Sequence, residues 1–204
     1  MRKAFTLAEV LITLGIIGVV AALTMPVLIT HYKKNVLITR MKKFYSVLNQ
    51  AVNMKIAQDG ELDGSVLTAV NDPDVAMNFF DVNYAPYMKV VEKTKTPKGM
   101  AAAFPDGSGL YLRKDSCELL STACTYVIFC VDYKKCTTVD ETVSPWQAVD
   151  GKELFSFGGT DGNYPTDVGD DRETILNNCK GPYPGACTTL IVHDGWEIKD
   201  DYPW

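Results

Sequence analysis

The chain has 204 residues and a formal net charge of −5, which allows about one domain of ordinary size plus an extension. The charge is unevenly divided. Residues 1–57 carry eight Lys and Arg residues and one acidic residue, a net charge of +7. Residues 58–204 carry 12 Lys and Arg residues and 24 acidic residues, a net charge of −12. The acidic part disfavours nucleic acid as a partner. The basic part could meet anionic lipid or an acidic protein surface, or its cations could cover a solvated face.

The N-terminal stretch places two cations, Arg2 and Lys3, and the small residue Ala4 directly before Phe-Thr-Leu-Ala-Glu. From Val10 to Thr30 there is no charged side chain, and about 20 apolar residues suffice to cross a bilayer. A carboxylate inside a membrane costs on the order of 3 kcal/mol or more, so Glu9 at the edge of the apolar run needs a functional reason. The pattern predicts one transmembrane segment at about residues 10–30.

This arrangement resembles the class III signal of type IV pilins and type II secretion pseudopilins. In that family, prepilin peptidase cuts just before the Phe on the cytoplasmic side and methylates the new terminus. The resemblance implies a leader at residues 1–4, a cut between Ala4 and Phe5, and an assembly role for Glu9, which matches the family's near-invariant Glu. The chain departs from the pattern at Ala4, where most members have Gly.

Two other interpretations of the N-terminal stretch stay open. A cleaved secretory signal would leave a free soluble domain, but the apolar run exceeds the usual length of about 7–15 residues and no clear small-x-small site follows. A plain single-span anchor would make Glu9 accidental.

A long helix is expected at residues 5–57. Beyond the apolar run, apolar residues recur at three- and four-residue spacing and predict one stripe that packs on a sheet: Leu37, Met41, Phe44, Leu48, Ala51 and Val52. Pro26 interrupts the pattern, and we expect a bend or local melting there, because proline lacks a backbone donor and clashes with the preceding turn.

Residues 58–204 are expected to form an extracytoplasmic head. Asp72-Pro73 predicts a capped helix through about Val91, with a break near Pro86 and an apolar aromatic stripe in the core. Strands are expected at residues 100–104, 109–113, 125–133 and 154–157. The class is therefore α+β, with the long helix packed on an antiparallel sheet. Residues 131–157 and the ending from Cys187 to Ile198 also resemble secretion-type pilin heads, which implies a pilin-like fold.

Six cysteines beyond an export signal imply an oxidising compartment and a disulfide framework. Cys124 and Cys130 would lie about 20 Å apart on one extended strand and cannot pair with each other. We expect three local pairs: Cys117 with Cys124, Cys130 with Cys136, and Cys179 with Cys187. A zinc site is disfavoured, because there is no Cys-x-x-Cys and the histidines lie elsewhere.

We expect no catalytic site, no metal and no cofactor. His193-Asp194 could be a base and its orienting carboxylate, but no nucleophile motif accompanies the pair, and a half-buried histidine is the more ordinary explanation. The acidic, glycine-rich loop at residues 158–171 could suit calcium, although its spacing fits no fixed motif and such loops are usually solvated.

The sequence therefore predicts a structural subunit of a type IV pilus or a type II secretion pseudopilus, not an enzyme. Its expected partners are copies of itself or other pilin-like subunits, prepilin peptidase, the inner-membrane assembly platform and membrane lipid. It would cross the inner membrane once and carry its head in the periplasm or outside the cell. The alternative is a membrane-anchored or minor-pilin module that binds a ligand or adheres.

Overall fold

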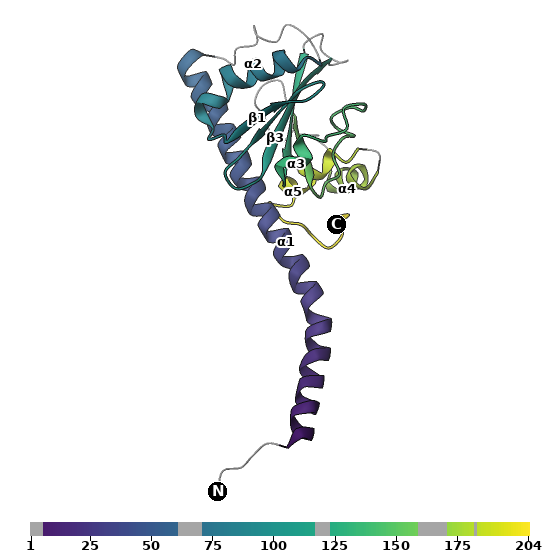
Figure 1. Cartoon of the computed structure of the whole chain (residues 1–204). Helices are drawn as coiled ribbons and strands as arrows, with labels where there is room; N and C mark the ends of the chain where they lie inside the picture. The colour runs from purple at the N-terminus through teal and green to yellow at the C-terminus, as the bar shows by residue number, and fades with distance from the viewer. Residues whose placement is uncertain (1–5, 61–70, 117–122, 159–170, 182) are drawn as a thin grey trace. The chain divides into compact units, whose positions relative to one another are not determined.

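The computed structural model describes residues 6–60, 71–116, 123–158, 171–181 and 183–204 (Figure 1). The chain divides into two compact units, Met1–Thr39 and Arg40–Trp204. The first unit consists, in its described part, of most of the long helix α1. The second contains the end of α1 and all the other described elements.

Helix α1 spans Leu7–Asp59, close to the expected residues 5–57. Pro26 lies inside it, and the chain is helical on both sides and at the proline itself. Of the two expected effects of Pro26, the local melting is wrong, and the bend stays a prediction. A proline removes only one backbone donor, and the turns on either side keep their own hydrogen bonds.

The described strands of the second unit form one antiparallel sheet in the order β1-β2-β3-β4-β5. Their bounds are Glu92–Lys95 for β1, Met100–Ala103 for β2, Gly109–Ser116 for β3, Ala123–Cys130 for β4 and Leu154–Gly158 for β5. Together with α1, the sheet confirms the α+β class.

The two faces of the sheet bury different sets of residues, because successive side chains of a strand point to opposite sides. On one face, the ring of Phe44 from α1 contacts Phe129 and Phe157, with centroids 5.0 and 5.2 Å away. The expected stripe of α1 is buried in this unit at Met41, Phe44, Leu48, Ala51 and Val52. The other face carries a second cluster built around Ala101, Tyr111, Ile128, Cys130, Cys136 and Val149.

Strand β4 is shorter at its end than the sequence predicted. The expected strand ran to Tyr133, but β4 ends at Cys130 and helix α3 occupies Tyr133–Cys136. Asp132 is the N-cap of α3, and its side chain accepts a hydrogen bond from the backbone N–H of Lys134 at 3.0 Å. The cap of α3 at Asp132 therefore prevents β4 from continuing to Tyr133.

Helix α2 spans Pro73–Asn83 and is followed by a 3-10 turn, η2, at Ala85–Tyr87. The carboxylate of Asp72 accepts from the N–H groups of Asp74 and Val75 at 2.8 and 3.3 Å, so the predicted cap is confirmed. The helix ends eight residues before the predicted Val91, because Pro86 needs a different backbone. The expected apolar stripe of Phe79, Phe80, Tyr84, Tyr87 and Val91 is core only in its first part. Phe79, Phe80 and Tyr84 are buried, whereas Tyr87 is half-buried and Val91 is exposed, because both lie beyond the end of α2.

Two helices near the end of the chain were not expected: α4 at Arg172–Lys180 and α5 at Ala186–His193. A disulfide joins Cys179 of α4 to Cys187 of α5, with the Cα atoms 4.7 Å apart. A second disulfide joins Cys130 to Cys136, with the Cα atoms 5.7 Å apart. These are two of the three expected pairs. The third expected pair, Cys117 with Cys124, includes Cys117, which lies outside the described residues.

Candidate functional site

The start of α1 is held by a reciprocal cap between Thr6 and Glu9. The N–H and the hydroxyl of Thr6 both donate to Oε2 of Glu9 at 2.8 Å, and the N–H of Glu9 donates to the Thr6 hydroxyl at 3.3 Å. This is the capping box, in which two of the four free donors of a helix start are satisfied. Both bonds to the carboxylate use Oε2, so Oε1 makes no hydrogen bond within the described residues.

The cap gives Glu9 a specific structural role at the start of α1, and its pair of hydrogen bonds with Thr6 was not predicted from the sequence. The spacing Thr-x-x-Glu at the start of an apolar helix was the signal that could have found it. The other predicted processing residues, Ala4 and Phe5, lie outside the described residues.

The first unit presents an apolar surface. Large apolar side chains of α1 are exposed along Leu7–Ile29; Leu23 and Val27, for example, are each 72% exposed. By length and composition, α1 is long and apolar enough to cross a membrane. A surface of this kind needs lipid or protein to cover it.

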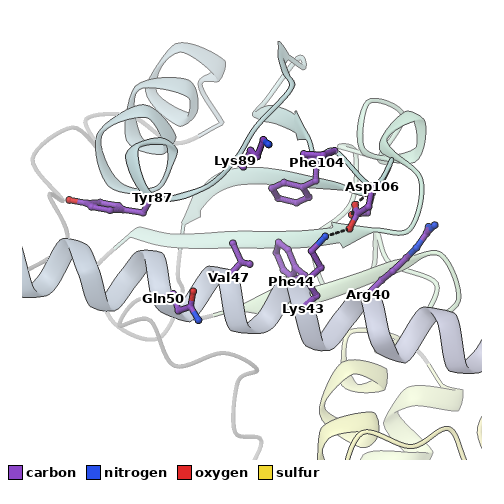
Figure 2. Close-up of a pocket in the computed structure, with 11 residues that line it drawn as sticks. Arg40, Lys43, Phe44, Val47, Gln50, Tyr87, Lys89, Phe104 and Asp106 are labelled. Carbon is purple, nitrogen blue, oxygen red and sulfur yellow. Dashed lines mark hydrogen bonds and ion pairs between the residues drawn. The ribbon is translucent and has the colours of Figure 1, made fainter.

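A groove of about 400 Å³ opens in the second unit, beside the end of α1 (Figure 2). On α1 it is lined by Arg40, Lys43, Phe44, Val47 and Gln50. Opposite, it is lined by Tyr87, Lys89, Phe104, Pro105, Asp106 and Ser108. We call this feature the basic groove, because three of its side chains are cationic and one is a carboxylate.

The carboxylate of the basic groove is firmly held. Asp106 accepts from Nζ of Lys43 at 2.7 Å, from the hydroxyl of Ser108 at 2.5 Å and from the N–H of Ser108 at 3.2 Å. Burial by itself would raise the pKa of Asp106, but the hydrogen bonds from Lys43 and Ser108 outweigh it and lower the pKa to about 2. Asp106 is therefore ionised at neutral pH and compensates the charge of Lys43.

A second charged cluster ties the C-terminal segment to α4. The guanidinium of Arg172 binds Asp194 through Nε at 2.6 Å and Nη2 at 2.8 Å, and binds Asp201 at 2.8 and 2.9 Å. Lys199 also reaches Asp194, at 2.8 Å. The hydrogen bonds from Arg172 lower the pKa of Asp194 to about 2 against the opposing effect of burial, with a smaller contribution from Lys199.

This cluster bears on the possible His193-Asp194 base pair. The Nδ1 atom of His193 lies 3.9 Å from Asp194, beyond hydrogen-bond distance, and Arg172 occupies both carboxylate oxygens. Asp194 therefore serves the ion-pair cluster and does not orient His193.

Glu141 is a structural anchor that sequence reasoning did not find. Its carboxylate accepts from the hydroxyl of Thr96 at 2.5 Å, from the hydroxyl of Tyr111 at 2.9 Å and from the N–H of Lys98 at 3.0 Å. Burial, and next to it the charge of Glu141, raises the pKa of Tyr111. These bonds fix the loop after α3 to the second face of the sheet. Nothing in the local sequence marks Glu141, because the partners of its carboxylate come from the turn between β1 and β2 and from strand β3.

The possible calcium loop falls mostly on residues 159–170, which lie outside the described residues. Its last carboxylate, Asp171, is the N-cap of α4 and accepts from the N–H groups of Glu173 and Thr174 at 2.9 and 3.1 Å. Among the described ranges, no group of three or more His, Cys, Asp and Glu side chains is placed to hold a metal ion.

The described residues thus define one α+β unit that includes the end of α1, and one unit in which α1 is apolar and exposed. The chain belongs to the DUF6613 family, a family of unknown function, whose model matches residues 27–186. The match begins after the N-terminal motif at residues 2–9. No curated protein and no solved structure matches this chain significantly.

Proposed function

We propose that this protein is a structural subunit of a helical, membrane-born filament, either a type IV pilus or a type II secretion pseudopilus. The observation that carries the proposal is the N-terminal stretch of the sequence. A basic leader and Phe5 precede α1, Glu9 lies in its first turn, and the helix that follows is apolar, exposed and long enough to cross a membrane. The antiparallel sheet packed on the end of α1 supports a pilin-like fold.

In this proposal the apolar surface of α1 has two successive partners. Lipid of the inner membrane covers it before assembly, and the same surface of neighbouring subunits covers it in the filament core. Prepilin peptidase removes residues 1–4, the assembly platform extracts the helix, and the head faces the periplasm or the outside of the cell. Export to an oxidising compartment agrees with the two disulfides of the described head.

The role of Glu9 in the filament follows from charge. Cleavage creates an ammonium at Phe5, and the Phe5 amine of one subunit can approach Glu9 of the next. The capping box leaves Oε1 of Glu9 open to such a partner while Thr6 holds Oε2. An ion pair of this kind would set the axial register and would select processed subunits, since an uncut chain has no amine there.

Two substitutions separate the assembly role of Glu9 from its capping role. Glu9→Gln keeps a side chain that functions in capping boxes but removes the charge, whereas Thr6→Val removes the hydroxyl cap and keeps the charge. We expect Glu9→Gln to insert in the membrane and fail to enter filaments, and Thr6→Val to enter them at near wild-type amounts. The measurement is the ratio of tagged subunit in sheared filaments to that in membranes at matched expression.

Normal incorporation of Glu9→Gln would show that Glu9 only caps α1. Absence of the wild-type subunit from every filament preparation, in cells with an active peptidase, would refute the filament function. Neighbouring genes distinguish the two systems, because a retraction ATPase favours a pilus, whereas a secretion ATPase and a secretin alone favour a pseudopilus.

The competing function is a membrane-anchored or minor-pilin module that binds a ligand, and the basic groove is the observation in its favour. The two functions are compatible, since a filament subunit can carry a ligand site on its head.

A further inference from the structure

We propose that the basic groove binds a small amphipathic organic anion, a molecule with an aromatic or alkyl body and one carboxylate. This inference does not depend on how the subunit assembles, because the basic groove lies entirely within the second unit of the chain.

The size and walls of the basic groove suit the body of such a molecule. Its volume of about 400 Å³ lies within the range of roughly 300–1,000 Å³ typical of small-molecule sites. Phe44 and Phe104 meet there with ring centroids 5.9 Å apart and planes tilted by 50°. Figure 2 shows Phe44 and Val47 rising from α1 toward the side from which Phe104 projects. Phe44 is buried behind Phe104, whereas Phe104 and Val47 are partly exposed, so an apolar body placed against these two side chains would remove water from both.

The charges of the basic groove select an anion. Arg40, Lys43 and Lys89 contribute three positive charges and Asp106 one negative charge, so the net charge is +2. Lys43 is already compensated by Asp106 at 2.7 Å. Arg40 donates to the neutral carbonyl of Val131 at 3.3 Å, which leaves its charge in place. Arg40 and Lys43 belong to the basic residues 1–57, and Lys89 adds a third cation from the acidic residues 58–204.

The two properties together define the ligand class. An inorganic anion would pair with Lys89 or Arg40 but leave the apolar side chains of Phe104 and Val47 in water. A neutral hydrocarbon would cover these side chains and leave the two cations without a negative partner. Only a molecule with both an apolar body and a negative charge covers the apolar side chains and also pairs with the cations. Asp106 is already paired with Lys43, and the remaining positive charge of Arg40 and Lys89 would repel a cation, which disfavours amphipathic amines.

The test uses the full chain in nanodiscs of neutral phosphatidylcholine and 6-phenylhexanoate as the probe, with binding measured by isothermal titration calorimetry. The alcohol 6-phenylhexan-1-ol has the same body without the charge, and acetate has the charge without the body. We expect the acid to bind saturably and at least tenfold more tightly than either control. Its affinity should fall with added salt, because exposed charges are screened.

Lys89→Met tests whether Lys89 pairs with the carboxylate of the ligand. It should weaken binding of the acid at least fivefold and leave binding of the alcohol unchanged. The matched control is Lys134→Met, an exposed cation on α3 outside the basic groove, which should change neither. Tryptophan fluorescence of both variants checks that the fold is kept.

Equal affinities for the acid and the alcohol would overturn the proposal, and so would an unchanged affinity of Lys89→Met for the acid. A third outcome comes from a photoreactive residue at position 47. If it crosslinks to a second copy of the chain and the acid does not compete, the basic groove is a contact between subunits and the proposal is wrong. Filament formation is scored separately, so this inference and the filament function can fail independently.

Discussion

Replacing Phe44 with Ala tests whether the end of α1 is a structural part of the head. Phe44 is only 4% exposed, and its ring contacts Phe104, Phe129 and Phe157 at centroid distances of 5.0–5.9 Å. These partners come from the turn after β2 and from two neighbouring strands, β4 and β5. One side chain of α1 therefore joins three segments of the sheet.

The expected loss of stability can be worked from these contacts. Burial of a Phe side chain contributes about 1.5–3 kcal/mol by transfer from water, and each aromatic pair adds about 0.5–1.5 kcal/mol. Core Phe→Ala substitutions cost about 3–5 kcal/mol once the cavity is included. We expect Phe44→Ala to lower the free energy of unfolding by about 4 kcal/mol, a large part of the 5–15 kcal/mol that is typical of a domain.

The measurement is urea unfolding of the full chain in detergent, followed by tryptophan fluorescence. Trp196 is a local reporter, because its ring lies 5.2 Å from that of Tyr45, the neighbour of Phe44. The matched control is Tyr183→Ala, an aromatic side chain that is 55% exposed, where we expect a change within about 0.5 kcal/mol. A loss below 1 kcal/mol for Phe44→Ala, similar to that of the control, would refute the packing of α1 on the sheet.

Three further predictions follow from other parts of the chain. Mass spectrometry of membrane material should find an N-methylated terminus at Phe5, and an intact first residue in a strain with active peptidase would contradict the proposed processing. Replacing both Cys179 and Cys187 by Ser should lower the free energy of unfolding of the head by about 2–3 kcal/mol in the same assay. An unchanged free energy of unfolding would argue against the disulfide between α4 and α5. Asp194, only 3% exposed at its side chain and with its pKa lowered to about 2, should contribute about 2 kcal/mol above pH 4 that is lost as the pH falls toward 2. The stability gap between wild type and Asp194→Asn should therefore narrow between pH 5 and pH 2.5, and a gap that stays constant over this range would exclude the assigned shift.

The elements that sequence reasoning found are those with local signals. The apolar spacing of α1, the Asp72-Pro73 cap and the pairing of Cys179 with Cys187 each depend on residues that are near one another in the chain. Such signals act before any tertiary contact forms, so they can be recognised without the fold.

The elements that were missed have signals that only the fold makes visible. Strand β1 reads Glu-Lys-Thr-Lys and has no apolar alternation, because it lies at the edge of the sheet and its side chains are largely exposed. Helix α5 carries the run Thr-Thr-Leu-Ile-Val, in which four of five residues are β-branched. By propensity this run favours a strand, yet it is helical and a disulfide joins Cys187 to α4. Tertiary packing decides both cases.

The basic groove was invisible in the sequence for a similar reason. Its cations on α1 are separated by nearly 50 residues from Lys89 and by more than 60 from Asp106. The sequence showed that the helix was basic but not which of its cations would face an aromatic wall.

Whether a larger residue can replace Gly151 depends on the disulfide between Cys179 and Cys187, which lies in another segment of the chain. Gly151 has a φ of +67°, and a Cβ atom there would lie 2.7 Å from Sγ of Cys187 and 3.1 Å from the hydroxyl of Tyr202, which donates to the carbonyl of Gly151 at 2.5 Å. While the disulfide is intact, its sulfur atom cannot turn aside, so a larger residue at 151 must displace the turn or α5. In the reduced chain the Cys187 side chain is free to change rotamer and part of the obstruction disappears. The oxidation state of the α4–α5 pair thus sets how much variation the distant turn can accept.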